Sequence, residues 1–406
     1  MYKRLKEEYI IQQSPFIPML VNQNEQCHFE LSESECALFE YLDGLHTYEN
    51  IIEEIFSFLN IGDDSFDEKE VVISNIKMFF YKYDEMIESS EVPFKRSKIF
   101  YGNDKYIIPF ELSIELTDKC ILACKHCYKN ANPHNETFIN YQSLINFLSS
   151  VKNDVDCIQL TGGEPMLHPY FFDILHFCKE NFNNVIISTT GLLITESTVK
   201  EFIGTHIYLS LYSFNEKEND DYTVYNAQQK VLNAAGLLVN NHVYTCINTI
   251  VSDGNINFLP SFIKQCETLG VQGLGIGKVV KVGRGKYLSP LDFCSPQTEE
   301  QVKEIEKNFF SNSMYLSTFA NNDTTEAQVP HCGLYRWIIN ENGNILPCAF
   351  FPQKFKIGHI TDDIQSVFNK RKFLLMKKEL RKWGTELGVK GISLTDVCPA
   401  LEFLDN

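Results

Sequence analysis

Three cysteines lie close together in the first half of the chain. Cys120, Cys124 and Cys127 have the spacing C-x3-C-x2-C in the segment LTDKCILACKHCYKN. Thiolates bind zinc, copper or iron–sulfur clusters. A zinc site would need a fourth ligand, for which His126 is the local candidate, and zinc sites more often use paired C-x2-C units. Three thiolates suit a four-iron cluster that leaves one iron open, so the spacing favours an iron–sulfur centre.

A second motif, LTGGEP at residues 160–165, follows at the end of a predicted strand. Two glycines permit close backbone approach and unusual dihedral angles, and a carboxylate can pair with an ammonium group. In this order, the two motifs resemble the signature of the radical S-adenosylmethionine (radical SAM) superfamily. The resemblance implies that the three cysteines are the catalytic ligands of a [4Fe-4S] cluster that works with SAM. It also implies SAM contacts from Tyr128, the aromatic residue after the third cysteine, and from Gly162, Gly163 and Glu164.

Further SAM contacts follow from weaker matches to the family pattern. The segment STTG stands where the family has its ribose-binding motif, which points to Ser188 and Thr190, and SLYS resembles the fourth-strand motif, which points to Ser210. The arginine that many relatives have downstream is missing from NDDYT at 219–223. Lys278 or Arg284 is the candidate to replace it on the SAM carboxylate, and the alternative is that both only keep their loop soluble.

These motifs must be held at the ends of strands, and the chain from residue 111 has a suitable pattern. Strand-like and helix-like segments alternate, which is typical of a parallel sheet with crossover helices. The predicted strands are 111–117, 157–163, 184–191, 207–213, 244–251 and 271–280, and the predicted helices are 141–152, 170–181, 195–203, 227–240 and 257–268. Sites in such folds lie at the carboxyl ends of strands. The resemblance makes 111–296 a partial (β/α)6 TIM-type barrel in an α/β chain.

The segment 297–406 contains a second set of cysteines. Cys332 and Cys348 flank a predicted hairpin turn at Asn342-Gly343. Their C-x10-G-x4-C spacing resembles the opening hairpin of SPASM and Twitch auxiliary-cluster domains. The resemblance implies one auxiliary iron–sulfur cluster, held by Cys332, Cys348 and Cys398. Its fourth ligand stays open between an unused site, a substrate thiol, His331, His359 and Asp396. A degenerate hairpin with buried thiols is the alternative.

The segment 1–92 predicts a separate small α/β domain. Two short strands fit residues 16–30, and helices are predicted after the cap Ser32, over 47–59 and over 67–82. The order of a hairpin and three helices resembles winged-helix-like PqqD domains. Such domains recognise a precursor peptide by binding its leader as an added strand.

Charge also separates this segment from the rest of the chain. Residues 1–92 contain 20 acidic and 6 basic residues, a net charge of −14, whereas the remainder has a net charge of −3. The simplest interpretation is a solvated surface. The alternative interpretation is that these acidic residues form a docking surface for a Lys/Arg-rich partner, such as a basic leader. Residues 93–110, with two prolines and a glycine, are predicted to be a linker.

Composition excludes several classes of protein. The chain has 406 residues, 44% of them hydrophobic, and a net charge of −17, which argues against nucleic-acid binding. It has neither a long apolar run nor a signal-peptide pattern, so a cytoplasmic location without membrane insertion is expected. In a reducing compartment the 13 cysteines predict free thiols, metal ligands or catalysis rather than disulfides.

The combination of leader-binding domain, radical SAM barrel and auxiliary cluster resembles maturases of ribosomally made peptides, of the sactisynthase and ranthipeptide kind. The resemblance implies thioether cross-linking of a Cys sulfur to a carbon of the same peptide, with a flavodoxin or ferredoxin as electron donor. Cross-linking through carbon or oxygen and epimerisation are the alternatives, and for the last of these Cys246 is the candidate hydrogen-atom donor. A Twitch-type dehydrogenase acting on another substrate would have the same cysteines. A non-catalytic peptide-binding protein would leave both motifs without a purpose.

Overall fold

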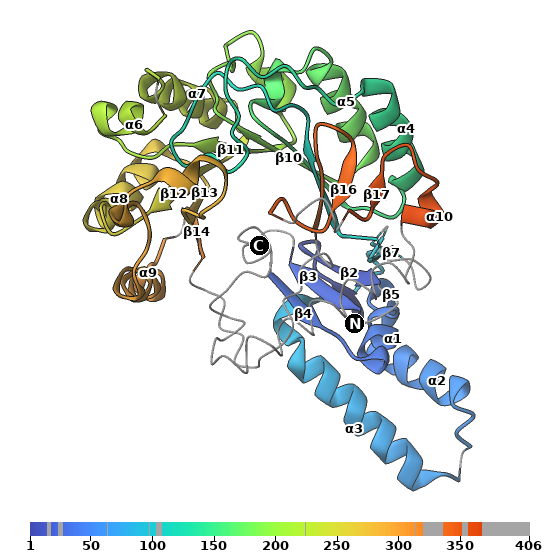
Figure 1. The fold of residues 1–406 in the computed structure, drawn as a ribbon. Coiled ribbons are helices and arrows are strands. Elements are labelled where there is room, and N and C mark those ends of the chain that lie inside the picture. The colour runs from blue at the N-terminus through green and yellow to red at the C-terminus, as the bar shows by residue number, and fades with distance from the viewer. Residues whose placement is uncertain are drawn as a thin grey trace, which may run out of the picture. The chain divides into compact units, whose positions relative to one another are not determined.

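The computed structural model describes residues 1–13, 18–22, 27–62, 64–96, 98–102, 108–223, 225–311, 313–319, 336–350 and 356–367. The chain forms two compact units, Met1–Ile108 and Pro109–Asn406 (Figure 1). None of the described helices is both long and apolar enough to cross a lipid bilayer.

The described residues of the first unit form seven short strands in two sheets. The four-stranded sheet has the order β4 (Cys27–Glu30), β3 (Met19–Asn22), β2 (Tyr9–Gln13) and β7 (Phe100–Gly102). The three-stranded sheet has the order β5 (Asp43–Thr47), β1 (Tyr2–Leu5) and β6 (Ile87–Ser90). β3 and β4 form the antiparallel pair that the sequence predicts over 16–30. The other five strands are not predicted, because segments such as YKRL and IESS have no alternating apolar pattern.

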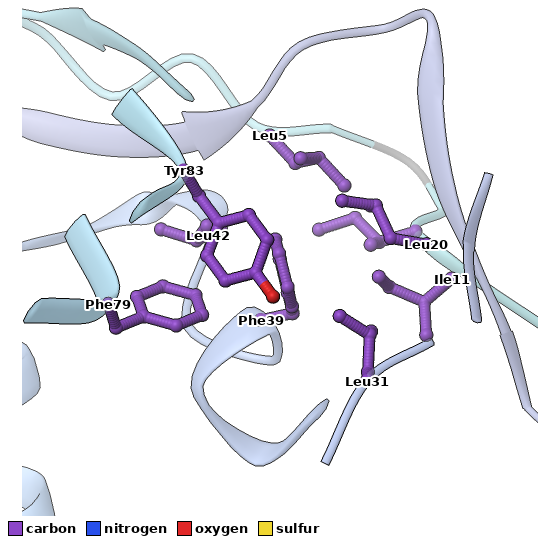
Figure 2. Close-up of a cluster of buried hydrophobic side chains, with 9 residues drawn as sticks. Leu5, Ile11, Leu20, Leu31, Phe39, Leu42, Phe79 and Tyr83 are labelled. Carbon is purple, nitrogen blue, oxygen red and sulfur yellow. The ribbon is translucent and has the colours of Figure 1, made fainter. Parts of the chain in front are cut away.

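The three helices predicted for this unit are confirmed. They are α1 (Glu33–Phe39), α2 (Tyr48–Phe58) and α3 (Phe66–Lys82), with a 3-10 turn, η1, at Asp84–Met86. Ser32 and Thr47 cap the first two helices, each in a reciprocal capping box. The ring of Phe39 lies 4.9 Å from Phe79 and 5.0 Å from Tyr83, so α1 packs on α3 above aliphatic side chains from the strands (Figure 2).

Residues 93–110 are not a linker, which corrects the predicted domain boundary at 92. Strand β7 lies in this segment and pairs in parallel with β2. Arg96 is buried, and its guanidinium donates hydrogen bonds to the carbonyl oxygens of Lys6 and Glu7 at 2.8 and 3.0 Å. The first unit therefore extends to residue 108.

The described strands of the second unit form one sheet of ten strands, which helices α4 to α8 accompany (Figure 1). At its centre are the six predicted parallel strands, which are adjacent in chain order: β8 (Glu111–Glu115), β9 (Cys157–Thr161), β10 (Asn184–Thr189), β11 (His206–Ser210), β12 (Tyr244–Val251) and β13 (Gly273–Lys278). Four predicted helices are confirmed: α4 (Tyr141–Val151), α5 (Phe171–Asn181), α7 (Gln228–Asn240) and α8 (Leu259–Leu269).

Two helices of this unit differ from the prediction. The segment 195–203 forms only a 3-10 helix, η3 (Val199–Phe202), and the polar segment EKENDDYT forms α6 (Glu216–Thr223), which no apolar periodicity indicates. The other 3-10 helices are η2 (Pro165–Leu167), η4 (Ile256–Phe258), η5 (Gly283–Tyr287) and η6 (Pro290–Asp292).

The sheet continues at both ends beyond the predicted barrel. On one side, α9 (Pro296–Asn308) leads to β14 (Tyr315–Thr318), which is parallel to β13. On the other, β15 (Arg336–Ile339) is parallel to β8 and is followed by β16 (Asn344–Leu346), β17 (Gly358–His359) and α10 (Ile364–Val367). The described strands after residue 296 therefore belong to the same sheet, which corrects that predicted boundary. The predicted hairpin is confirmed by the antiparallel pairing of β15 with β16, with Gly343 at φ 75°.

The capping box of α1 makes the stability of the first unit depend on pH. Burial raises the pKa of Glu35, but hydrogen bonds from Lys82, Ser32 and Tyr83 outweigh it and bring the pKa to about 2. This lies below the ordinary value, so the stabilisation is present above about pH 4.5 and is lost as the pH falls towards 2. Thermal unfolding of the metal-free protein should show Glu35→Gln less stable by about 1–2 kcal/mol at pH 7. The two proteins should converge near pH 2, and a constant difference at every pH would contradict this account.

Candidate active site

The three-cysteine motif lies in a long loop between β8 and α4, residues 116–140, which we call the cysteine loop. Cys120 is buried, whereas Cys124 and Cys127 are half-buried. The backbone N–H of Cys120 donates to the carbonyl oxygen of Asn132 at 3.1 Å, and the N–H of Cys127 donates to that of Cys124 at 3.2 Å. The loop lies at the carboxyl end of β8, where the sequence predicts the site.

The glycines of the second motif pack against the cysteine loop. Gly162 has φ 131°, and a Cβ atom on it would lie 2.5 Å from the carbonyl oxygen of Thr117. A Cβ atom on Gly163 would overlap the carbonyl group of Lys119. The N–H groups of Gly163 and Glu164 donate to these two carbonyl oxygens at 2.7 and 2.8 Å. The close backbone approach that the sequence predicts is therefore found between the Gly162–Gly163 turn and the start of the cysteine loop.

Glu164 and Thr190, which the sequence takes from two separate motifs, are in direct contact. The buried carboxylate of Glu164 accepts hydrogen bonds from the hydroxyl of Thr189 at 2.7 Å and from the backbone N–H of Thr190 at 2.8 Å. The Thr190 hydroxyl and the N–H of Met166 also donate to it. Burial raises the pKa of Glu164, although these bonds oppose the rise. A cation at this carboxylate would stabilise its ionised form, which suits the predicted ammonium contact.

Ser188 and Ser210 lie on neighbouring strands of the parallel sheet. The Ser188 hydroxyl accepts from the side-chain amide of Gln159 at 2.9 Å, and the same amide accepts from Ser113 at 2.8 Å. These three polar side chains therefore form one hydrogen-bonded row across the adjacent strands β8, β9 and β10. Ser210 ends β11.

Tyr128 lies in a different environment from the other predicted SAM contacts. Its hydroxyl donates to Glu115 at 2.7 Å, and its ring is edge-on to Phe350 at 5.4 Å. Burial, with the nearby Glu115 carboxylate, raises the pKa of Tyr128 well above its ordinary value. Its contacts are with Glu115 and Phe350 rather than with Glu164 or Thr190, so SAM binding by Tyr128 stays a prediction without geometric support.

Another aromatic residue of the motif, His126, has contacts that the sequence does not reveal. Its ring stacks on Tyr222 at 4.8 Å and is edge-on to Tyr212 at 4.7 Å. Burial lowers its pKa to about 4, so the ring is neutral near neutral pH. Its Nδ1 atom is buried and has no hydrogen-bond partner among the described residues. It could accept or donate one bond to a bound group.

Helix α6 holds the same part of the loop through its carboxyl end. The N–H groups of Ala123 and Lys125 donate to the carbonyl oxygens of Thr223 and Tyr222 at 3.3 and 3.0 Å. The segment 219–223, where the family pattern would have an arginine, thus supports the cysteine loop by backbone contacts.

The two cations proposed to replace that arginine are both engaged elsewhere. Lys278 pairs with Glu299 at 2.6 Å. Arg284 donates to backbone carbonyl oxygens of the cysteine loop. These contacts favour neither residue as the partner of the SAM carboxylate.

A buried ion network beside the cysteine loop was not predicted. Lys129 pairs with Glu115 at 2.6 Å and also with Glu341, and all three side chains are at most 15% exposed. Glu115 ends β8, and Glu341 lies in the turn between β15 and β16. The network therefore ties the hairpin that leads to Cys348 to the loop that contains the other three cysteines.

The predicted auxiliary cluster can be examined only in part. Cys348 is half-buried after β16, whereas Cys332, Cys398, His331 and Asp396 lie outside the described residues. Both ring nitrogens of His359 have partners: Nδ1 accepts from the N–H of Thr361 at 3.2 Å, and Nε2 donates to the carbonyl of Asn342 at 2.8 Å. These bonds disfavour His359 as the fourth ligand.

The donor set fits a cluster better than a single ion. A mononuclear zinc would bring its sulfur ligands to about 2.3 Å from one centre, whereas in an iron–sulfur cluster each thiolate binds a different iron. The Cys120 and Cys124 thiols, whose pKa values burial raises to about 12, would bind iron as thiolates.

Comparison with known proteins agrees with this geometry. The family model of the radical SAM superfamily matches residues 114–256, which contain both motifs. Residues 114–256 are therefore a radical SAM domain. The match includes the end of β8 and all of β9 to β12, with the cysteine loop, Glu164 and Thr190.

The similarity to individual proteins extends beyond the radical SAM domain. The chain is 22% identical over 354 residues to the antilisterial bacteriocin subtilosin biosynthesis protein AlbA of Bacillus subtilis, which covers 84% of this chain and 77% of AlbA. It is 22% identical to the sporulation killing factor maturation protein SkfB of the same organism, over 64% of each chain. Streptococcus suis SuiB bound to S-adenosylmethionine has the same fold, with a TM-score of 0.62 at 16% identity, over 90% of this chain and 88% of SuiB.

The close contact at Gly163 gives a test of the site. We expect Gly163→Ala to destabilise the protein by about 2 kcal/mol, because its methyl group would overlap the Lys119 carbonyl. The radical SAM domain should then bind less iron after anaerobic reconstitution. Gly236→Ala in α7 is the matched control, because a methyl group there meets no atom within 4 Å, and it should be neutral or slightly stabilising. Normal iron content and melting temperature in Gly163→Ala would refute the account.

Proposed function

We propose that this protein is a radical SAM maturase that modifies a ribosomally synthesised precursor peptide by forming an intrapeptide thioether. The observation that carries the proposal is the extent of the similarity to AlbA, which covers 84% of the chain and so includes more than the radical SAM domain. AlbA and SkfB are named for the biosynthesis or maturation of peptides, and SuiB has also been crystallised with its precursor peptide SuiA.

The proposed roles in the radical SAM domain follow the geometry. Cys120, Cys124 and Cys127 would hold a [4Fe-4S] cluster, which supplies the electron that converts SAM into a hydrogen-abstracting radical. Glu164, with the backbone and hydroxyl of Thr190 fixing its carboxylate, would bind the methionine ammonium. We propose that the parallel sheet acts as a partial (β/α)6 barrel that admits the peptide at the carboxyl ends of its strands.

Thioether formation needs an acceptor for a second electron. The peptide loses one hydrogen atom from carbon, one proton from the Cys sulfur and one electron, as the carbon–sulfur bond forms. We propose that Cys348, with Cys332 and Cys398 from outside the described residues, holds a Twitch-like auxiliary iron–sulfur cluster that accepts this electron. The buried pairing of Lys129 with Glu341 supports the idea, because it keeps the Cys348 hairpin beside the cysteine loop.

Leader recognition is assigned to the first unit as a PqqD-like domain. β4 is an end strand of its sheet among the described strands, and such an edge can accept an added peptide strand. Residues 1–92 have a net charge of −14, which favours a basic leader. We also propose a cytoplasmic location and a flavodoxin or ferredoxin as electron donor.

Mass spectrometry of an anaerobic reaction tests the chemistry. Reconstituted protein, SAM, a reductant and a candidate precursor peptide that contains Cys should give a product lacking two hydrogens, with one Cys no longer open to alkylation. The Cys124→Ala protein is the control and should give neither this product nor deoxyadenosine. A loss of two hydrogens with every Cys still open to alkylation would indicate another cross-link. If the reaction is run in D2O, a peptide that gains one deuterium without losing two hydrogens would indicate epimerisation. Deoxyadenosine with an unchanged peptide would refute the maturase proposal.

Binding of a labelled leader tests the role of the first unit. We expect fluorescence anisotropy to show binding by the full chain that weakens as salt is added, because salt screens exposed charges. A chain that lacks residues 1–108 should lose this binding but still form deoxyadenosine. The truncation is placed at 108 because β7 and Arg96 belong to the first unit. Equal leader affinity of the two proteins would show that the leader binds elsewhere.

A further inference from the structure

The loop after β13 makes contacts with the cysteine loop that its sequence does not suggest. In the segment VGRGK, Arg284 lies in η5, more than 150 positions after the cysteines. The backbone N–H of Arg284 donates to the carbonyl oxygen of Cys127 at 3.0 Å. Its side chain donates from Nε to the carbonyl oxygen of Cys124 at 2.7 Å and from Nη2 to that of Ala131 at 2.8 Å. One residue thus satisfies three carbonyl groups around the bend that bears Cys124 and Cys127.

The glycine before Arg284 is required for this approach. Gly283 has φ 56°, and a Cβ atom on it would lie 2.5 Å from the carbonyl oxygen of Cys127 and closer still to that of Tyr128. A side chain at this position would therefore push the two segments apart. Gly283 therefore leaves room for the backbone of the cysteine loop, and Arg284 forms the hydrogen bonds to it.

The chemistry of the side chain explains why an arginine is present. A guanidinium is planar and presents its N–H donors as a fork in fixed directions. Here the fork joins two carbonyl groups that are seven residues apart in the sequence. A lysine ammonium is a single centre on a flexible stem and would not fix both groups in one geometry. The positive charge of the guanidinium also opposes the rise that burial causes in the pKa values of the Cys120 and Cys124 thiols.

We propose that Arg284 is a positioning residue that holds the cysteine loop in its cluster-binding shape, by joining the carbonyl groups of Cys124 and Ala131. Arg284 does not bind SAM or the substrate in this role. The role concerns the radical SAM domain alone and does not depend on which molecule is modified. A cysteine loop without this clamp would sample shapes in which the three sulfur atoms do not converge on one cluster.

Three variants separate the geometry of the side chain from its charge. Arg284→Lys keeps the charge and removes the fork, and Arg284→Gln removes both. Lys286→Gln is the matched control, because Lys286 is an exposed cation in the same 3-10 helix. Circular dichroism and thermal unfolding would establish that each variant is folded.

Two readouts do not require catalytic turnover. In the metal-free proteins, hydrogen–deuterium exchange in peptides covering residues 119–132 should be faster for both Arg284 variants than for the wild type, while α8 is unchanged. After reconstitution, loss of iron to a chelator should be about tenfold faster or more in both variants, the range expected when a residue behind the metal ligands is removed. Lys286→Gln should match the wild type in both measurements.

The midpoint potential of the reconstituted cluster distinguishes the contribution of charge. A nearby positive charge favours the reduced cluster, so Arg284→Gln should have a more negative potential, while Arg284→Lys should be close to the wild type. Wild-type exchange and chelation rates in Arg284→Lys would overturn the proposal, because they would show that charge alone suffices. Wild-type exchange and chelation rates in Arg284→Gln would show that Arg284 has no role in holding the cysteine loop. If Arg284→Gln does not fold, the rates of Arg284→Lys decide the matter.

Discussion

The structure depends on how the cysteine loop is held from outside. Residues 116–140 contain neither a helix nor a strand, so no regular ladder of hydrogen bonds satisfies their backbone groups. Some of their partners lie within the loop, such as Asn132 for Cys120, and others come from distant segments: the Gly162–Gly163 turn after β9, the carboxyl end of α6, and Arg284 after β13. Each of these lies at the carboxyl end of the parallel sheet. The sheet therefore acts as a frame that brings hydrogen-bond donors and acceptors to one loop, and the positions of the three sulfur atoms follow from these bonds.

Burial of charge is the second constraint on the site. Lys129, Glu115 and Glu341 are nearly excluded from solvent, and breaking such a buried pair by removing one partner is strongly destabilising. The hairpin of β15 and β16 is consequently fixed next to β8 at two places, because Arg336 on β15 also donates to the buried Glu111 at 2.9 Å. This arrangement keeps the hairpin that leads to Cys348 in the same sheet as β8, after which the cysteine loop begins. The described strands after residue 296 are thus an extension of the radical SAM sheet.

Much of the fold could be predicted because its signals are local. The capping boxes at Ser32 and Thr47, the apolar strands β8 to β13 and the Asn342-Gly343 turn each follow from a few neighbouring residues. The failures have a common cause. β1, β6 and β7 are short and mixed in polarity, and α6 has no apolar face, so these elements exist because of their partners. β7 illustrates this, because its own sequence predicts a linker and only its pairing with β2 makes it a strand.

For the site, the sequence by itself determined the chemistry. The spacing of Cys120, Cys124 and Cys127 and the order of the cysteine and glycine motifs indicated the superfamily, because reactive groups and tight turns need particular residue types. Only the tertiary structure decided which residues support them. Thr190 meets Glu164, Tyr222 stacks on His126, and Arg284 clamps the loop instead of standing free for SAM. These partners are far apart along the chain, and their pairing is set by strand order in the sheet, which no local pattern contains.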